Sequence, residues 1–139
     1  QNFKIDVIQV PINILDKRFL NSIIINIVKK KKVEFIARSV FLKSLLIKKP
    51  SKYRKIFSKN KKIYNFLVNF SKKGEKKAVK NCVQFVKDQK IVNKLILGVS
   101  NKSQLIELAN FMKTKKKPAN FKVPNIEDQR LLDPRSWVI

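Results

Sequence analysis

Apolar and polar positions follow one another in segments that predict alternating strands and helices. Residues 4–10 form a short, β-branched run closed by Pro11, which is typical of a buried strand. Over residues 17–32 apolar side chains recur at helical spacing, and Asp16 precedes them as a candidate N-cap. Residues 33–38 form a second strand-like run. A strand, a helix and a strand within about 35 residues indicate a βαβ unit, whose two strands lie parallel in one sheet.

The same alternation continues in the second half of the chain. Two helices are expected at residues 61–73 and 75–89, with Gly74 ending the first of them. A third strand is expected at residues 91–98, and then a helix that Ser100 or Asn101 caps and that ends near Lys113. The apolar positions expected to face inward in the first three helices are Phe19, Leu20, Ile23, Ile24, Ile27 and Val28, then Ile63, Phe66, Leu67 and Phe70, then Val79, Cys82, Val83 and Val86. The predicted class is α/β.

The chain of 139 residues is long enough for one domain with a core. We place that domain at residues 1–114, followed by a mostly irregular tail at 115–139 that contains three prolines. The chain opens on Gln1 inside sequence that already looks structured, so we expect an upstream part. A transmembrane helix needs about 20 apolar residues, and polar residues interrupt the longest apolar stretch. We therefore expect no membrane association.

The charge balance allows two interpretations. Lys and Arg number 33 against 9 Asp and Glu, a net charge of +24, which favours a lysine-rich nucleic-acid-binding module. Only five of the basic residues are arginine, and the lysines are spread along the whole chain. A bias of AT-rich coding explains this pattern in any fold, and net charge says little about function. We favour the coding bias and do not expect sequence-specific nucleic-acid binding.

Several kinds of chemistry are missing from the sequence. The chain has no histidine, so it has no imidazole base, no Ser-His-Asp arrangement and no histidine metal site. The single cysteine, Cys82, cannot form an internal disulfide and fits a reducing cytoplasm. Two glycines cannot build a G-x-G-x-x-G turn or a Walker loop. Residues 98–104 lead from a strand into a helix N-terminus, which favours either an anion site or a plain helix cap.

Four segments, taken together and in this order, resemble the second half of aldo/keto reductases. IDVIQVPINILDKRF at residues 5–19 resembles the family's sixth barrel strand, and VEFIARSVFLKSLL at 33–46 resembles the seventh strand with its loop. KLILGVSNKSQLIEL at 94–108 resembles the eighth strand and helix, and LLDPRSW at 131–137 resembles the C-terminal ending. The resemblance covers nearly the whole chain.

The resemblance implies the C-terminal half of a (β/α)8 TIM barrel, with three parallel strands and outer helices. It further implies an oxidoreductase that, when complete, transfers hydride between a nicotinamide cofactor, NADP or NAD, and a small carbonyl or alcohol substrate. The family's catalytic Asp, Tyr, Lys and His belong to the first four strands, so no residue of this chain is expected to be catalytic. A half-barrel leaves strand edges unpaired, so we expect self-association. A non-catalytic barrel remnant is the remaining alternative.

The resemblance also assigns cofactor-binding positions. Gln9 matches the glutamine that binds the nicotinamide carboxamide, and Arg38 stands where many members have a stacking aromatic residue. The residues matched to the cofactor's phosphates are Ser39, Phe41 and Leu42 over the pyrophosphate, and Gly98, Ser100, Asn101, Lys102 and Gln104 at the adenosine phosphate. Three departures from the family pattern leave NADP and NAD both open: Lys43-Ser44 in place of Gln-Gly, Leu108 in place of Asn, and Asn101 in place of Arg.

Overall fold

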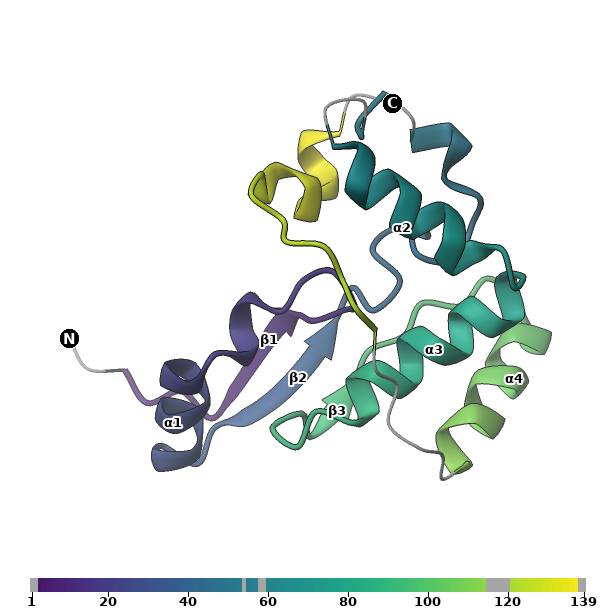
Figure 1. The fold of residues 1–139 in the computed structure, drawn as a ribbon. Coiled ribbons are helices and arrows are strands. Elements are labelled where there is room, and N and C mark those ends of the chain that lie inside the picture. Colours follow the sequence, from purple (N-terminus) through teal and green to yellow (C-terminus); the bar gives the residue numbers. More distant parts are fainter. Residues whose placement is uncertain (1–2, 54, 58–59, 115–120, 138–139) are drawn as a thin grey trace.

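The central element of the protein is a sheet of three parallel strands (Figure 1). The computed structural model describes residues 3–53, 55–57, 60–114 and 121–137. The strands β1 (Val7–Pro11), β2 (Glu34–Arg38) and β3 (Lys94–Leu95) lie in the order β1-β2-β3. Both neighbouring pairs are parallel. The predicted arrangement of parallel neighbours in chain order is therefore confirmed.

Four α-helices accompany the strands in the described part of the chain. They are α1 (Ser22–Lys30), α2 (Lys61–Ser71), α3 (Glu75–Lys87) and α4 (Lys102–Lys113). In Figure 1, α1 lies at the β1 side of the sheet, and α3 and α4 lie at the β3 side. Short 3-10 turns are found at Arg18–Leu20, Pro50–Tyr53, Gln129–Leu132 and Pro134–Ser136. The α/β class is confirmed.

The two faces of the sheet differ in burial. Val10, Phe35 and Ala37 point to one face and are almost fully buried in the main core. The opposite face carries Val7 and Ile96, which are both close to half exposed. We call this second surface the open face. A parallel sheet is normally covered on both sides, so the open face is the unusual feature of this fold.

The first predicted helix is wrong in its start and at two of its six inward positions. A 3-10 turn at Arg18–Leu20 precedes α1, and Asn21 is the N-cap, its side chain accepting a hydrogen bond from the Ile24 amide at 3.0 Å. Asp16 is instead buried and pairs with Arg18. Ile23 and Ile27 are 71% and 52% exposed. The other predicted positions face inward: Val28 is buried, and Phe19, Leu20 and Ile24 pack against the core.

The third strand is shorter than the predicted 91–98, because regular pairing with β2 covers only Lys94–Leu95. Asn93 also joins the ladder, since its side chain accepts from the Phe35 amide at 2.8 Å while its own amide donates to the Phe35 carbonyl at 2.9 Å. Gly74 lies beyond the C-cap of α2 and is the N-cap of α3, with φ of 88°. Glycine adopts this left-handed conformation at no steric cost.

The remaining helix predictions agree with the structure. Ile63 and Leu67 are the buried residues of α2, while Phe66 and Phe70 pack against the core from a half-buried position. In α3, Cys82, Val83 and Val86 are buried. The Lys87 ammonium of α3 donates to the Met112 and Thr114 carbonyls at 2.7 and 3.1 Å. A cation suits a helix C-terminus, so Lys87 fixes α4 against α3.

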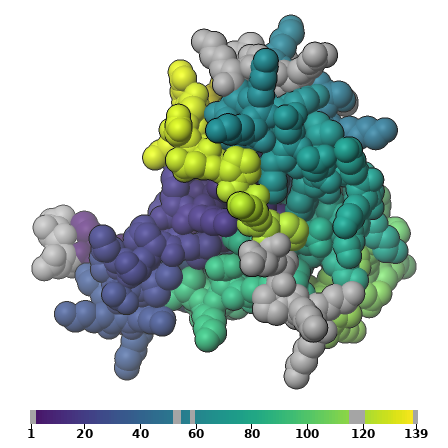
Figure 2. Space-filling view, viewed as in Figure 1, coloured from purple at the N-terminus to yellow at the C-terminus, as the bar shows by residue number. Residues whose placement is uncertain are grey.

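The C-terminal segment packs into the same core as the strands. Leu131, Leu132 and Trp137 belong to the core cluster, and the Phe121 ring meets the Phe70 ring edge to face at 5.3 Å. In Figure 2 this segment, drawn in yellow, lies over the N-terminal part of the chain in purple and against α2 in teal. Apart from its two 3-10 turns, its described part is irregular. Residues 115–120 and 138–139 of the predicted tail lie outside the described residues.

Candidate functional site

The loop after β2 has an unusual backbone. Ser39, Leu42, Lys43 and Ser44 have φ of 57°, 44°, 49° and 68°. Non-glycine residues rarely adopt this left-handed conformation, which costs about 1–2 kcal/mol per residue. Such strain persists only where the surrounding structure imposes it, and it is often found at functional sites.

A buried polar turn holds the start of this loop. Asn13 is fully buried, and its amide nitrogen donates to the Ser39 carbonyl at 3.1 Å. Its side-chain oxygen accepts from the Leu15 and Asp16 amides at 3.0 and 2.9 Å. Asn13 thereby ties the loop after β1 to the loop after β2. The sequence carried a signal for it, since Asn13 is a polar residue inside an apolar run.

The N-terminus of α4 is closed by its own side chains. The Asn101 side chain accepts from the Gln104 amide at 2.9 Å, and the Gln104 side chain accepts from the Ser100 amide at 2.9 Å. This reciprocal pattern resembles a capping box. For Ser100, Asn101 and Gln104, the structure therefore shows the plain helix cap that was one of the two interpretations of residues 98–104.

Two adjoining cavities open beside the carboxyl ends of β2 and β3, and we call them the strand-end cavities. Their volumes are about 350 and 440 Å³. Six of the ten predicted site residues line one or both of them: Ser39, Phe41, Leu42, Gly98, Ser100 and Gln104. The Leu42 side chain is also part of the buried core, so a ligand would meet this residue through its backbone. The fold thus brings together two loops that are more than fifty residues apart in sequence.

The other four predicted residues do not line the strand-end cavities. Gln9 is exposed on β1, and its backbone register with Ile36 places it on the open face. Arg38 ends β2, where its guanidinium donates to the Ser39 hydroxyl at 3.1 Å. Asn101 caps α4 and Lys102 begins it. Their proposed roles toward a cofactor stay predictions.

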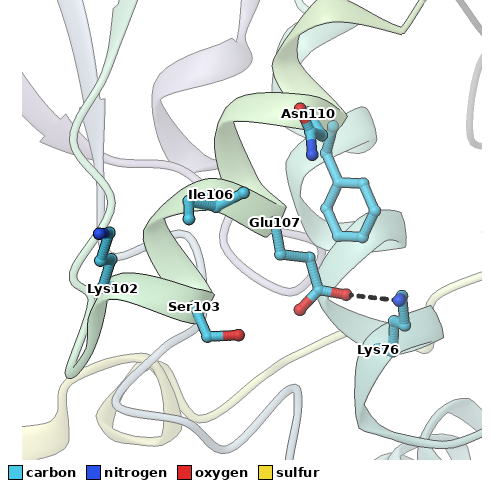
Figure 3. Close-up of a pocket in the computed structure, with 7 residues that line it drawn as sticks. Lys76, Lys102, Ser103, Ile106, Glu107 and Asn110 are labelled. Atoms are coloured by element: carbon cyan, nitrogen blue, oxygen red, sulfur yellow. Dashed lines mark ion pairs between the residues drawn. The ribbon is translucent and has the colours of Figure 1, made fainter.

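A groove between α3 and α4 adjoins the larger strand-end cavity (Figure 3). Lys76 of α3 faces Glu107 of α4, with 3.2 Å between Nζ and Oε1. This contact is an ion pair without hydrogen-bond geometry, and the Glu107 oxygen is buried. Sequence reasoning did not place either residue in the site. Glu107 follows Gln104 by three positions, and residues at this spacing share a helix face.

The single cysteine of the chain is buried and free. Burial raises the pKa of the Cys82 thiol, so it stays protonated and unreactive. No cluster of potential metal ligands was found in the described part of the chain. None of its helices is long and apolar enough to cross a membrane. Exposed lysines occur on all four helices, and the nucleic-acid alternative stays untested.

The fold and site together define an α/β protein whose cavities open at the carboxyl ends of parallel strands, where such folds bind ligands. The model of the Aldo/keto reductase family matches residues 1–123. The chain therefore belongs to the aldo/keto reductase family, whose fold is a (β/α)8 barrel and whose members are oxidoreductases. No curated protein matches the chain significantly.

Proposed function

We propose that this chain is the C-terminal half of an aldo/keto reductase barrel and that it carries part of the nicotinamide-cofactor site. When bound, the cofactor, NADP or NAD, supplies the hydride exchanged with a carbonyl or alcohol substrate. The residues of this chain bind and orient the cofactor. The catalytic side chains belong to the half of the barrel that the resemblance assigns to earlier strands.

The observation that carries this proposal is the position of the strand-end cavities. In barrel enzymes the active site lies at the carboxyl ends of the strands, and both cavities lie at the ends of β2 and β3. The open face gives further support, because the inner face of a barrel strand is normally covered by side chains of the other strands.

The side chains of these cavities fit a phosphorylated dinucleotide. Lys43 lines the smaller cavity, and Lys48 and Lys76 line the larger one, where Lys76 is paired with Glu107. Both cavities therefore carry positively charged side chains, which suit phosphate oxygens. The larger cavity is also lined by the carboxylates Glu75 and Glu107. Carboxylate oxygens only accept hydrogen bonds when ionised, which suits amino and hydroxyl groups of an adenosine.

A substitution at Gly98 tests the proposal. A Cβ atom built at Gly98 meets no other atom within 4 Å, so a side chain at this position starts in open space, and Gly98→Leu adds bulk where Gly98 lines both cavities. We expect Gly98→Leu to weaken NADPH binding about tenfold or more, because overlap with the ligand costs several contacts. Binding is measured by NADPH fluorescence at about 0.2 M salt, which suppresses non-specific attraction to the basic surface.

The control is Asn26→Leu, which adds the same side chain at an exposed position of α1. We expect it to bind NADPH like the unmodified chain. Circular dichroism of all three proteins shows whether each substitution leaves the fold intact. Equal affinities in the three proteins, or no binding by the unmodified chain, would contradict the proposal. A parallel titration with NADH distinguishes NADP from NAD.

A further inference from the structure

A third cavity opens where β1 and β2 end against the C-terminal 3-10 turns. Its volume is about 720 Å³, and Pro11 and Leu132 contribute to its walls. Four cationic side chains also line it, and one carboxylate: Arg18, Arg38, Lys43, Arg135 and Asp133. We call it the arginine cavity. It shares Ser39 and Lys43 with the smaller strand-end cavity but contains neither Gly98 nor Ser100.

The composition of the chain makes this gathering of arginines informative. Only five of the 33 basic residues are arginine, and three of them line this one cavity. Of the other two, Arg130 does not line it and Arg54 lies outside the described residues. Arginine differs from lysine in presenting a planar fork of donors that matches a carboxylate or a phosphate. The concentration of arginines in this cavity therefore points to a ligand with a carboxylate or a phosphate group.

Two of the three guanidinium groups are held in place by aspartates two residues earlier. Arg18 Nη2 lies 2.9 Å from Asp16 Oδ2, and its Nε donates to Asp16 Oδ1 at 3.0 Å. Arg135 repeats this arrangement with Asp133, at 2.7 Å from Nη2 to Oδ2 and 2.9 Å from Nε to Oδ1. Each guanidinium has five N–H donors. The pairing uses one edge of each guanidinium. On the other edge, Arg18 Nη1 donates one hydrogen bond to Gln129 Oε1 at 3.3 Å, and the remaining N–H donors of Arg18 and Arg135 point away from the two aspartates and can serve a ligand.

Arg38 differs from these two because its guanidinium is not paired with an aspartate. Its one described partner is the Ser39 hydroxyl, and no described carboxylate forms an ion pair with it. Arg38 is the register partner of Pro11 on β1, and Pro11 follows Gln9 by two residues. Side chains two residues apart on a strand point the same way, so Gln9, Pro11 and Arg38 share one face of the sheet. The cavity thus extends from the part of the open face where the nicotinamide position is proposed.

We propose that the arginine cavity binds the acidic group, carboxylate or phosphate, of a small organic molecule. Resting on the proposed function, this assigns the substrate class as carbonyl compounds that carry an acidic group. Arg38 contributes the unpaired charge, and Arg18 and Arg135 contribute pre-oriented donors. The cofactor's own phosphates belong to the strand-end cavities, where Gly98 and Ser100 lie.

Binding of two simple anions tests this assignment in the chain as it stands. Malonate and inorganic phosphate are titrated separately, and the arginine Nε–H signals are followed by NMR at constant ionic strength. We expect the signals of Arg18, Arg38 and Arg135 to shift together. Arg38→Gln should weaken binding about tenfold, which is the loss of one charged hydrogen-bonding partner. Arg38→Lys should recover only part of it, because lysine has no fork.

The matched control is Arg130→Gln. Arg130 forms the same Asp-x-Arg pair with Asp128, with Nη2 and Oδ2 2.9 Å apart, but does not line the cavity. Equal weakening by Arg130→Gln, or full retention by Arg38→Lys, would overturn the proposal. Competition between NADPH and malonate would overturn it as well, because the cavity would then belong to the cofactor. If the chain binds malonate but not NADPH, the anion site is supported and the proposed cofactor-binding function is contradicted.

Discussion

At the scale of single residues, Ser44 is the clearest case of a residue type that does not suit its backbone conformation. Its φ is 68°, and it stands where one branch of the family has glycine in the resemblance described above. Leu42 and Lys43 before it are left-handed as well. Ser44 therefore adopts a left-handed conformation without the glycine that fits it best, and the loop is strained there.

Ser44→Gly should stabilise the protein. Removing the Cβ relieves a left-handed conformation that costs about 1–2 kcal/mol, while glycine makes the unfolded chain more flexible by about 0.5–1 kcal/mol. We expect a net gain of about 0.5–1 kcal/mol in the free energy of unfolding, measured by urea denaturation. Ser44→Ala keeps the Cβ and should give no such gain. A Ser44→Gly protein that is no more stable than Ser44→Ala would show that the loop is not strained there.

At the scale of elements, the two C-terminal 3-10 turns depend on Asp133. It is the C-cap of Gln129–Leu132 and the N-cap of Pro134–Ser136, where its side chain accepts from the Arg135 amide. The hydrogen bonds from Arg135 lower the pKa of Asp133 to about 2. The turns in turn hold Leu131 and Trp137 in the core.

Acid should release this segment. Because the pKa of Asp133 is lowered in the folded state, its carboxylate stabilises the fold fully above the usual value near 3.8. That contribution is lost as the pH falls through about 2. Trp137 is the only tryptophan and is 8% exposed, so its fluorescence reports the release as a shift to longer wavelength.

Asp133→Ala removes the side-chain acceptor that caps the second turn and should show the long-wavelength emission of Trp137 already at neutral pH. The matched control is Glu127→Ala, which removes an exposed carboxylate in the same segment. Its emission should stay that of the unmodified chain at neutral pH. If both substitutions leave the emission unchanged, Asp133 does not hold the turns in place.

At the scale of the whole molecule, the open face and the net charge have opposite effects on self-association. Val7 and Ile96 expose apolar surface on the sheet, and such a surface favours association. The net charge of +24 repels a second copy. Salt screens this repulsion, since the Debye length is about 10 Å at 0.1 M and 3 Å at 1 M.

The chain should therefore self-associate more strongly as salt is added. Sedimentation velocity at about 0.05 and 0.5 M salt measures this, with the larger species expected at the higher concentration. Ile96→Lys places a charge on the open face and should reduce association. Asn69→Lys adds the same charge at an exposed position of α2 and serves as the control. A chain that stays monomeric at both concentrations, or equal effects of the two lysines, would exclude the open face as the contact surface.

Local pattern was sufficient to determine the class of this protein and the order of its strands and α-helices, but not the start of α1 or the length of β3. In α2 and α3 the apolar residues recur at helical spacing along one face, so only that face can turn toward the core. Ile63 and Leu67 of α2 and Cys82 and Val86 of α3 are buried accordingly. The β-branched runs determined the strands, and the short βαβ connection determined their parallel order. Six residues of the strand-end cavities followed from the resemblance, whereas Lys48, Lys76 and Glu107 did not.

Only the tertiary structure decided which surfaces stay open and which polar residues meet. Asn21 caps the first helix and makes it begin at Ser22. Ile23 and Ile27 stay exposed although they belong to the apolar pattern, because the core covers only the part of this face that carries Ile24 and Val28. Arg18, Arg38 and Arg135 are far apart in sequence and line one cavity only because two loops and the C-terminal turns converge. Contacts between distant segments leave no periodic trace in a sequence, since periodicity records only which side of its own element a residue occupies.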